Sequence, residues 1–175
     1  MNEKKGNISG LVWALIAAGF VVAATIAIIV AYSYARTAWR EIARTEAQSR
    51  RAELKSNLQT IQSHLSLYRT EHRRQFPGIT ADGTFDGELF ARQMTNPTDG
   101  NGKVMDPETT EGAGEEYPFG PYLDEIPENP MVDTEVARRV TGGPNPPPRD
   151  GSSAWWLDTG TGDLSANHTK PKPAP

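Results

Sequence analysis

The 175-residue sequence contains no cysteine. A disulfide framework, a thiolate zinc site and a cysteine nucleophile are therefore excluded. The sequence also lacks the GxSxG, HExxH and P-loop motifs that mark common catalytic sites. Histidine is scarce, and His64 and His72 have no second ligand at a metal-binding spacing, so we interpret them as surface or packing residues. We predict no catalytic residue, no enzyme activity and no small-molecule substrate.

Proline is missing until Pro77, and charged residues are missing from Leu11 to Tyr32. This 22-residue apolar run (LVWALIAAGFVVAATIAIIVAY) contains a single glycine. As a helix it would span about 33 Å, close to the hydrocarbon thickness of a bilayer. A removed signal peptide is the alternative, but its apolar region usually has about 7–15 residues. The length favours a transmembrane helix that is retained.

Charge is divided unevenly along the chain. Residues 1–76 hold 11 Lys and Arg against 5 Asp and Glu, whereas residues 77–175 hold 7 against 17. The acidic distal part argues against a nucleic-acid partner, because phosphate binding needs a basic face. Lys4 and Lys5 precede the apolar run and five arginines follow it within residues 36–51. Taken alone, this count places the distal side in the cytoplasm.

The helix is predicted to continue beyond the membrane. Residues 33–53 are polar, rich in Arg and Ala, and predict a helical stalk. Small residues fall largely at four-residue spacing in the apolar run, which either allows close helix–helix packing or reflects how common alanine is in membrane helices. These candidate self-assembly residues are Ala14, Ala18, Ala23, Ala27 and Ala31.

An apolar stripe with spacings of 4, 3, 4 and 3 follows the stalk and ends the long helix. Its first four members, Leu54, Leu58, Ile61 and Leu65, are also candidate self-assembly residues, and Tyr68 completes it. A stripe of this width needs one covering layer, for which we predict a small sheet. A coiled coil is the alternative, but the stripe is only about two heptads long. We predict that the helix ends at Phe76-Pro77-Gly78.

The distal region is predicted to contain few regular elements. We expect a short helix at residues 86–94 with Asp86 as its N-cap, and a loop at residues 95–116. Residues 117–130 contain four prolines and predict an extended segment that presses Tyr122, Leu123 and Ile126 onto the core. Residues 132–140 are consistent with either a strand or a helical turn, and 142–151 form a proline-rich loop.

A β-hairpin is predicted over residues 154–167, with the turn Asp158–Asp163 between two apolar runs. Hard oxygen ligands in a glycine-rich turn suit calcium, so Asp158 and Asp163 are candidate metal ligands. The alternative is that Asp and Gly simply suit tight turns, and the residues alone favour it.

Four segments carry a resemblance to a known family. They are KSNLQTIQSHLSLY (55–68) followed by Phe76-Pro77, FARQMTNPTD (90–99), GPYLDEIPENP (120–130) and WLDTGTGDLSAN (156–167). Behind a membrane helix and in this order, they resemble the type IV pilins and the major pseudopilins of type II secretion systems. The resemblance implies an α+β fold, in which a long N-terminal spine helix is packed by a small antiparallel sheet. It also implies calcium in the C-terminal loops, at Asp158 and Asp163.

The same resemblance implies a place in the cell and a partner. It indicates a single-pass protein of the bacterial inner membrane, with the distal domain in the periplasm. The chain is expected to assemble with copies of itself and with other secretion or pilus assembly components into a filament. The implied organisation is a leader-like segment at 1–10, a transmembrane helix at 11–32, a stalk at 33–53, a pilin-like domain at 54–168 and a disordered tail at 169–175.

The N-terminus departs from the family pattern. Family precursors are cut after a glycine that follows a basic leader, which points to Gly6 as the processing site here. They also carry a glutamate at the fifth mature position, whereas this chain has Leu11 there and no glutamate between Glu3 and Glu41. The departure leaves a second function open, in which the chain is a permanently anchored, pilin-like scaffold or partner-binding module.

Overall fold

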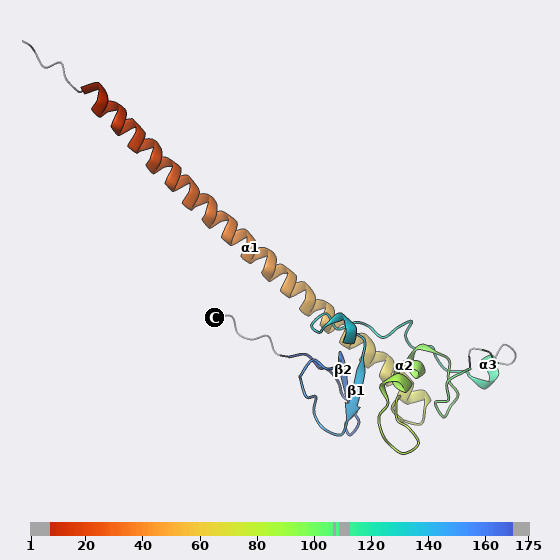
Figure 1. The fold of residues 1–175 in the computed structure, drawn as a ribbon. Helices are drawn as coiled ribbons and strands as arrows, with labels where there is room; N and C mark the ends of the chain where they lie inside the picture. Colours follow the sequence, from red (N-terminus) through yellow and green to blue (C-terminus); the bar gives the residue numbers. More distant parts are fainter. Residues whose placement is uncertain (1–7, 107, 109–112, 170–175) are drawn as a thin grey trace, which may run out of the picture. The chain divides into compact units, whose positions relative to one another are not determined.

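The computed structural model describes residues 8–106, 108 and 113–169, and the side chains of 12–106, 108 and 114–169. The chain divides into two compact units, Met1–Gln48 and Ser49–Pro175. Helix α1 (Ile8–Glu71) is one uninterrupted helix of 64 residues (Figure 1). This continuity follows from the sequence, because no proline and only Gly10 and Gly19 occur within it.

The first unit consists of the N-terminal part of α1. Every described side chain of this unit, from Val12 to Gln48, is exposed, and large apolar residues such as Leu15 and Phe20 are 65% and 73% exposed. The segment is long and apolar enough to cross a membrane. Its backbone hydrogen bonds are internal to the helix, which suits a lipid environment. The apolar side chains of this unit are therefore left for lipid or for another chain to cover.

In the second unit, the apolar stripe of α1 faces the core as predicted. Ile61, Leu65 and Tyr68 are 0%, 3% and 2% exposed. They pack with side chains from the rest of the unit, among them Phe90, Met94, Ile126, Trp155 and Leu157. Two polar side chains at the edges of the stripe add specific ties. The amide of Asn57 donates to the carbonyl of Glu128 over 2.8 Å, and that of Gln62 donates to the carbonyl of Leu164 over 3.0 Å.

Helix α1 ends at Glu71, five residues before the predicted stop at Phe76. Arg73 and Arg74 have φ angles of 54° and 66°, in the left-handed region. The N–H of Arg74 donates to the carbonyl of Arg69 over 2.7 Å, which is the closing hydrogen bond of a Schellman motif. The chain therefore leaves the helix through two arginines, although glycine usually fills such a position.

The sheet has three strands in the order β1 (Val140–Gly143), β2 (Trp155–Asp158) and β3 (Leu164–Ala166). β2 and β3 form the predicted antiparallel hairpin, with Leu157 opposite Leu164. β1 pairs with β2 in parallel, so the sheet is mixed and not wholly antiparallel. The reason is the proline-rich connection 144–154, which returns the chain to the start of the sheet before β2 begins. β1 also takes Gly142 and Gly143, which were predicted as loop.

The remaining elements largely agree with those predicted from the sequence. Helix α2 (Gly87–Thr95) begins after Asp86, whose Oδ1 accepts from the N–H groups of Glu88 and Leu89 over 2.8 and 3.1 Å. A short helix α3 (Ala113–Glu116) forms the end of the predicted loop 95–116, and a 3₁₀ turn η1 (Thr134–Val136) precedes β1.

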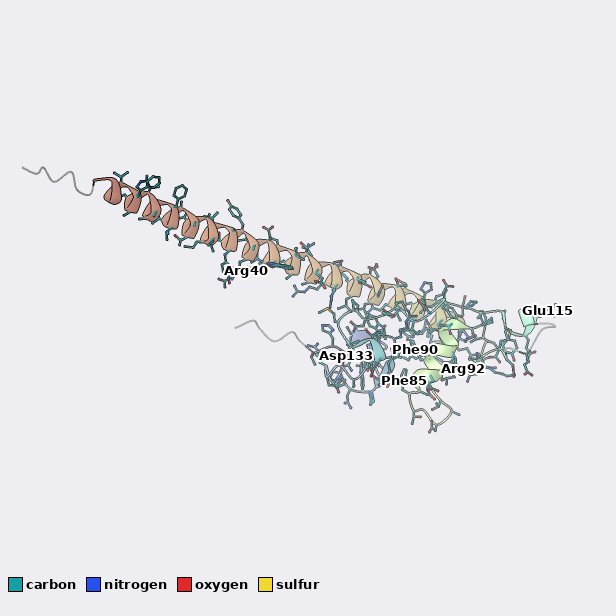
Figure 2. The ribbon with its side chains drawn as sticks, turned by 45° about the horizontal axis from the view of Figure 1, so that its top comes forward. Arg40, Phe85, Phe90, Arg92, Glu115 and Asp133 are labelled. Carbon is teal, nitrogen blue, oxygen red and sulfur yellow. The ribbon has the colours of Figure 1, made fainter. Side chains whose placement is uncertain are left out.

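The proline-rich segment 117–130 buries Tyr122, Leu123 and Ile126 as predicted. Figure 2 labels Phe85 and also Phe90 of α2, and the ring centroids of the two lie 6.0 Å apart.

The α+β class is therefore confirmed. The chain combines a long, apolar N-terminal helix with a small sheet on which its C-terminal part packs. This is a pilin-like architecture. The predicted boundary at residue 54 lies inside the second unit, and of the predicted tail only Thr169 is among the described residues.

Candidate assembly surfaces and the C-terminal turn

The alanines of the apolar run do not share one face of α1. Steps of four residues rotate a helix position by about 40°, but the five-residue step from Ala18 to Ala23 rotates it by about 140°. Ala14 and Ala18 therefore lie on one side, while Ala23, Ala27 and Ala31 lie roughly opposite. All five are exposed. The self-assembly interpretation thus concerns two small-residue faces, each able to approach a different neighbouring helix.

The four candidate residues of the apolar stripe differ in burial. Ile61 and Leu65 are covered by the chain's own domain, so they contribute to the core and have no surface to offer another copy while the domain is folded. Leu54 and Leu58 are only partly buried at the edge of the core. The self-assembly role predicted for the four residues is therefore kept here for Leu54 and Leu58. The proposed processing residue, Gly6, lies outside the described residues.

In the turn of the hairpin, the Asp158 carboxylate organises the backbone. Its Oδ1 accepts from the N–H groups of Gly160 and Thr161 over 2.8 and 3.1 Å. The carboxylate of Asp163 accepts from the Thr161 hydroxyl over 3.1 Å. Among the described residues, no group of three or more acidic or histidine side chains could hold a metal ion. Asp158 thus makes an Asx-type turn, and Asp163 holds the turn through the Thr161 hydroxyl.

Calcium at this turn remains a prediction, and a thermal melt tests it. If Asp158 and Asp163 bind calcium with backbone carbonyls, millimolar calcium raises the melting temperature, and the D163N variant loses this shift. If the aspartates act only on the turn, calcium has no effect. In that case D158A still costs about 1 kcal/mol, because two N–H groups lose their acceptor. Magnesium at the same concentration is the control for ionic strength.

A buried polar network joins the end of α1 to two distant segments. The ring of His72 is fully buried and stacks on Tyr68, with centroids 3.9 Å apart. Its Nδ1 lies 2.8 Å from the carbonyl oxygen of Tyr68, which can only accept, so Nδ1 carries the hydrogen. Nε2 lies 3.0 Å from the hydroxyl of Thr98. His72 is thus a packing residue, in agreement with the sequence.

Tyr122 extends this network to the proline-rich segment. Its hydroxyl donates to the carboxylate of Glu71 over 2.5 Å, and its ring meets that of Tyr68 edge-on at 5.3 Å. Burial, and then the hydrogen bond and charge of Glu71, raise the pKa of Tyr122 far above its ordinary value. Because Tyr122 keeps its proton, it ties this segment to α1 as a permanent donor. The four-residue spacing of Tyr68 and His72 predicts that both lie on one face of a helix. No sequence pattern near Tyr68 or His72 predicts that Thr98 and Tyr122 contact them.

Comparison with known proteins gives no assignment. No protein family matches the sequence, no curated protein shows significant similarity, and no solved structure matches the fold significantly.

Proposed function

We propose that this chain is a structural subunit of a pseudopilus or type IV pilus-like filament in a bacterial secretion system. Its helix α1 anchors it in the inner membrane before assembly, its second unit lies in the periplasm, and its partners are copies of itself and other assembly components. The order of the four pilin-like segments supports this assignment. So does the architecture of a long helix whose C-terminal part alone is covered by a small sheet.

The observation that carries the proposal is the exposure of α1. From Val12 to Glu53 no described side chain is buried, although large apolar groups are frequent up to Ile42. A monomer in water would leave this surface uncovered at a cost of roughly 25 cal/mol per Å² of apolar area. Lipid covers it in an anchored subunit, and neighbouring α1 helices cover it in a filament. The two alanine faces allow such helices to approach on opposite sides.

A permanently anchored scaffold is the second candidate. It is favoured by the missing glutamate at the fifth position after Gly6, since an intramembrane charge at that place has a functional reason in the family. In this reading the chain keeps its N-terminus and presents the second unit to a partner. The two candidates differ in the N-terminal residue of the native protein and in contacts between copies.

The native N-terminus is the first test of the filament assignment. We expect a prepilin peptidase to cut after Gly6, so that intact-mass spectrometry of protein purified from native membranes shows a chain beginning at Asn7. The G6L variant, which places a bulky side chain at the cut, should then keep the leader, because family precursors are cut after a glycine. A wild-type chain that begins at Met1 would exclude processing and favour the anchored scaffold.

A further inference from the structure

Three arginines follow the apolar run of α1 at four-residue spacing. They are Arg36, Arg40 and Arg44, and each is exposed. Each four-residue step turns the helix by about 40°, so the three side chains lie within an arc of about 80°. Figure 2 shows Arg40 projecting from α1. The chain therefore carries a basic strip along one side of the helix, directly after the segment that suits a bilayer.

The strip has no carboxylate partner of its own. In the part of α1 that the structure describes, none of the three arginines forms an ion pair. The nearest acidic residue after Arg36 is Glu41, five positions along the chain. Before Arg36, no acidic residue occurs for more than thirty positions. Three guanidinium groups on one exposed helix face can therefore donate together to an anionic ligand.

Aromatic residues place the strip at the membrane surface. Tyr32, Tyr34 and Trp39 are 70%, 72% and 71% exposed on α1. Tyrosine and tryptophan concentrate at the headgroup level of membranes, where the ring is apolar and its polar end is hydrated. Nothing else in the described part of the first unit covers these rings. They mark residues 32–39 as the level at which α1 leaves the bilayer.

Helix geometry brings the guanidinium groups to the lipid phosphates. Arg36, Arg40 and Arg44 lie about 6, 12 and 18 Å beyond Tyr32 along the axis, and the headgroup layer is about 5–8 Å deep on each face. Side chains on a helix lean toward its N-terminus, which here is the membrane side. Arg36 therefore lies within the layer and Arg40 leans back into it, while Arg44 stays within about one Debye length of it.

We propose that Arg36, Arg40 and Arg44 form a binding site for the phosphate groups of anionic phospholipids at the surface where α1 leaves the membrane. The arginines make bidentate hydrogen bonds to phosphodiester oxygens, and the aromatic belt fixes the depth of the helix. The proposal rests on the membrane span and holds for both candidate functions. It also gives these arginines a role on either side of the membrane, because both leaflets present phosphodiesters.

Lipid selectivity of the full-length chain tests the proposal. The chain is purified in a non-ionic detergent, mixed with equal amounts of phosphatidylglycerol and phosphatidylcholine, and the retained lipids are counted by native mass spectrometry. Each basic residue near an anionic surface contributes about fivefold, so we expect phosphatidylglycerol to be preferred by about tenfold or more. The R36Q/R40Q/R44Q variant should bind the two lipids equally within about twofold.

A matched variant controls for total charge. R51Q/K55Q/R92Q also removes three positive charges, but from residues that lie beyond the strip, on α1 and α2 (Figure 2 labels Arg92). It should keep the preference, as should R36K/R40K/R44K to a smaller degree. The proposal is overturned if the strip variant keeps the wild-type preference or if the control variant loses as much. It is also overturned if millimolar inorganic phosphate displaces the lipid where chloride of equal ionic strength does not, because the site would then recognise free anions.

Discussion

Replacing Trp155 with alanine is expected to cost about 3–5 kcal/mol of unfolding free energy in the second unit. Trp155 is fully buried in β2, and its indole N–H donates to the carbonyl of Pro127 over 2.8 Å. The substitution leaves a cavity in the core cluster that also contains Ile61 and Leu65 of α1, and it removes the donor from the carbonyl of Pro127. Small domains have a total stability of about 5–15 kcal/mol, so this is a large fraction of the available stability.

Calorimetry of the full chain in mild detergent measures this loss, and we expect the melting temperature of the second unit to fall by roughly ten degrees or more. W39A is the matched control, because Trp39 is 71% exposed in the first unit. Its effect on the same transition should stay within about 0.5 kcal/mol. An equal decrease in both variants would contradict the burial of Trp155 in the core.

The second large effect is expected at Gly87, the first residue of α2. Replacing glycine by alanine in a helix normally stabilises it by about 0.5–1 kcal/mol. Here a Cβ would lie 2.1 Å from the carbonyl oxygen of Val140 and 3.2 Å from its carbon. Both are backbone atoms at the start of β1, so α2 must move away from the sheet. We expect G87A to reverse the usual sign and to destabilise the unit by about 1–3 kcal/mol.

Urea denaturation measures this change, with G114A as the comparison. Gly114 lies in α3 and has no atom within 4 Å of an added Cβ. G114A should be neutral or slightly stabilising, because only the entropy of the unfolded chain changes. If G87A is as well tolerated as G114A, α2 does not approach β1 as closely as described.

The sequence predicts those parts of the fold that depend on local periodicity. The 4-3-4-3 stripe from Leu54 to Tyr68 identifies the core face of α1, because helical spacing alone places these residues together. Asp86 signals the start of α2 in the same way, since its side chain caps N–H groups two and three residues away. The β2–β3 hairpin follows from a glycine-rich turn between apolar runs.

The remaining features depend on partners far along the chain or on unusual backbone angles. Nothing in Val140–Gly143 indicates that it pairs in parallel with β2, because the register is set by a connection of eleven residues. Arg73 and Arg74 adopt left-handed angles that their residue type does not suggest. The bond between His72 and Thr98 joins residues 26 positions apart. The candidate calcium ligands depend equally on backbone geometry that a sequence pattern does not specify.

Cysteine cross-linking in native membranes tests the filament assignment most directly. The chain has no cysteine, so A18C/A27C introduces two thiols on roughly opposite faces of α1. A head-to-tail assembly that does not close extends from both faces, whereas a closed dimer uses one shared interface. Oxidation of A18C/A27C should produce a ladder of dimers, trimers and larger species. Each single variant should remain monomeric, because in a head-to-tail contact the Ala18 face of one copy meets the Ala27 face of the next. A double variant that remains monomeric, or that stops at dimers, would contradict assembly through α1.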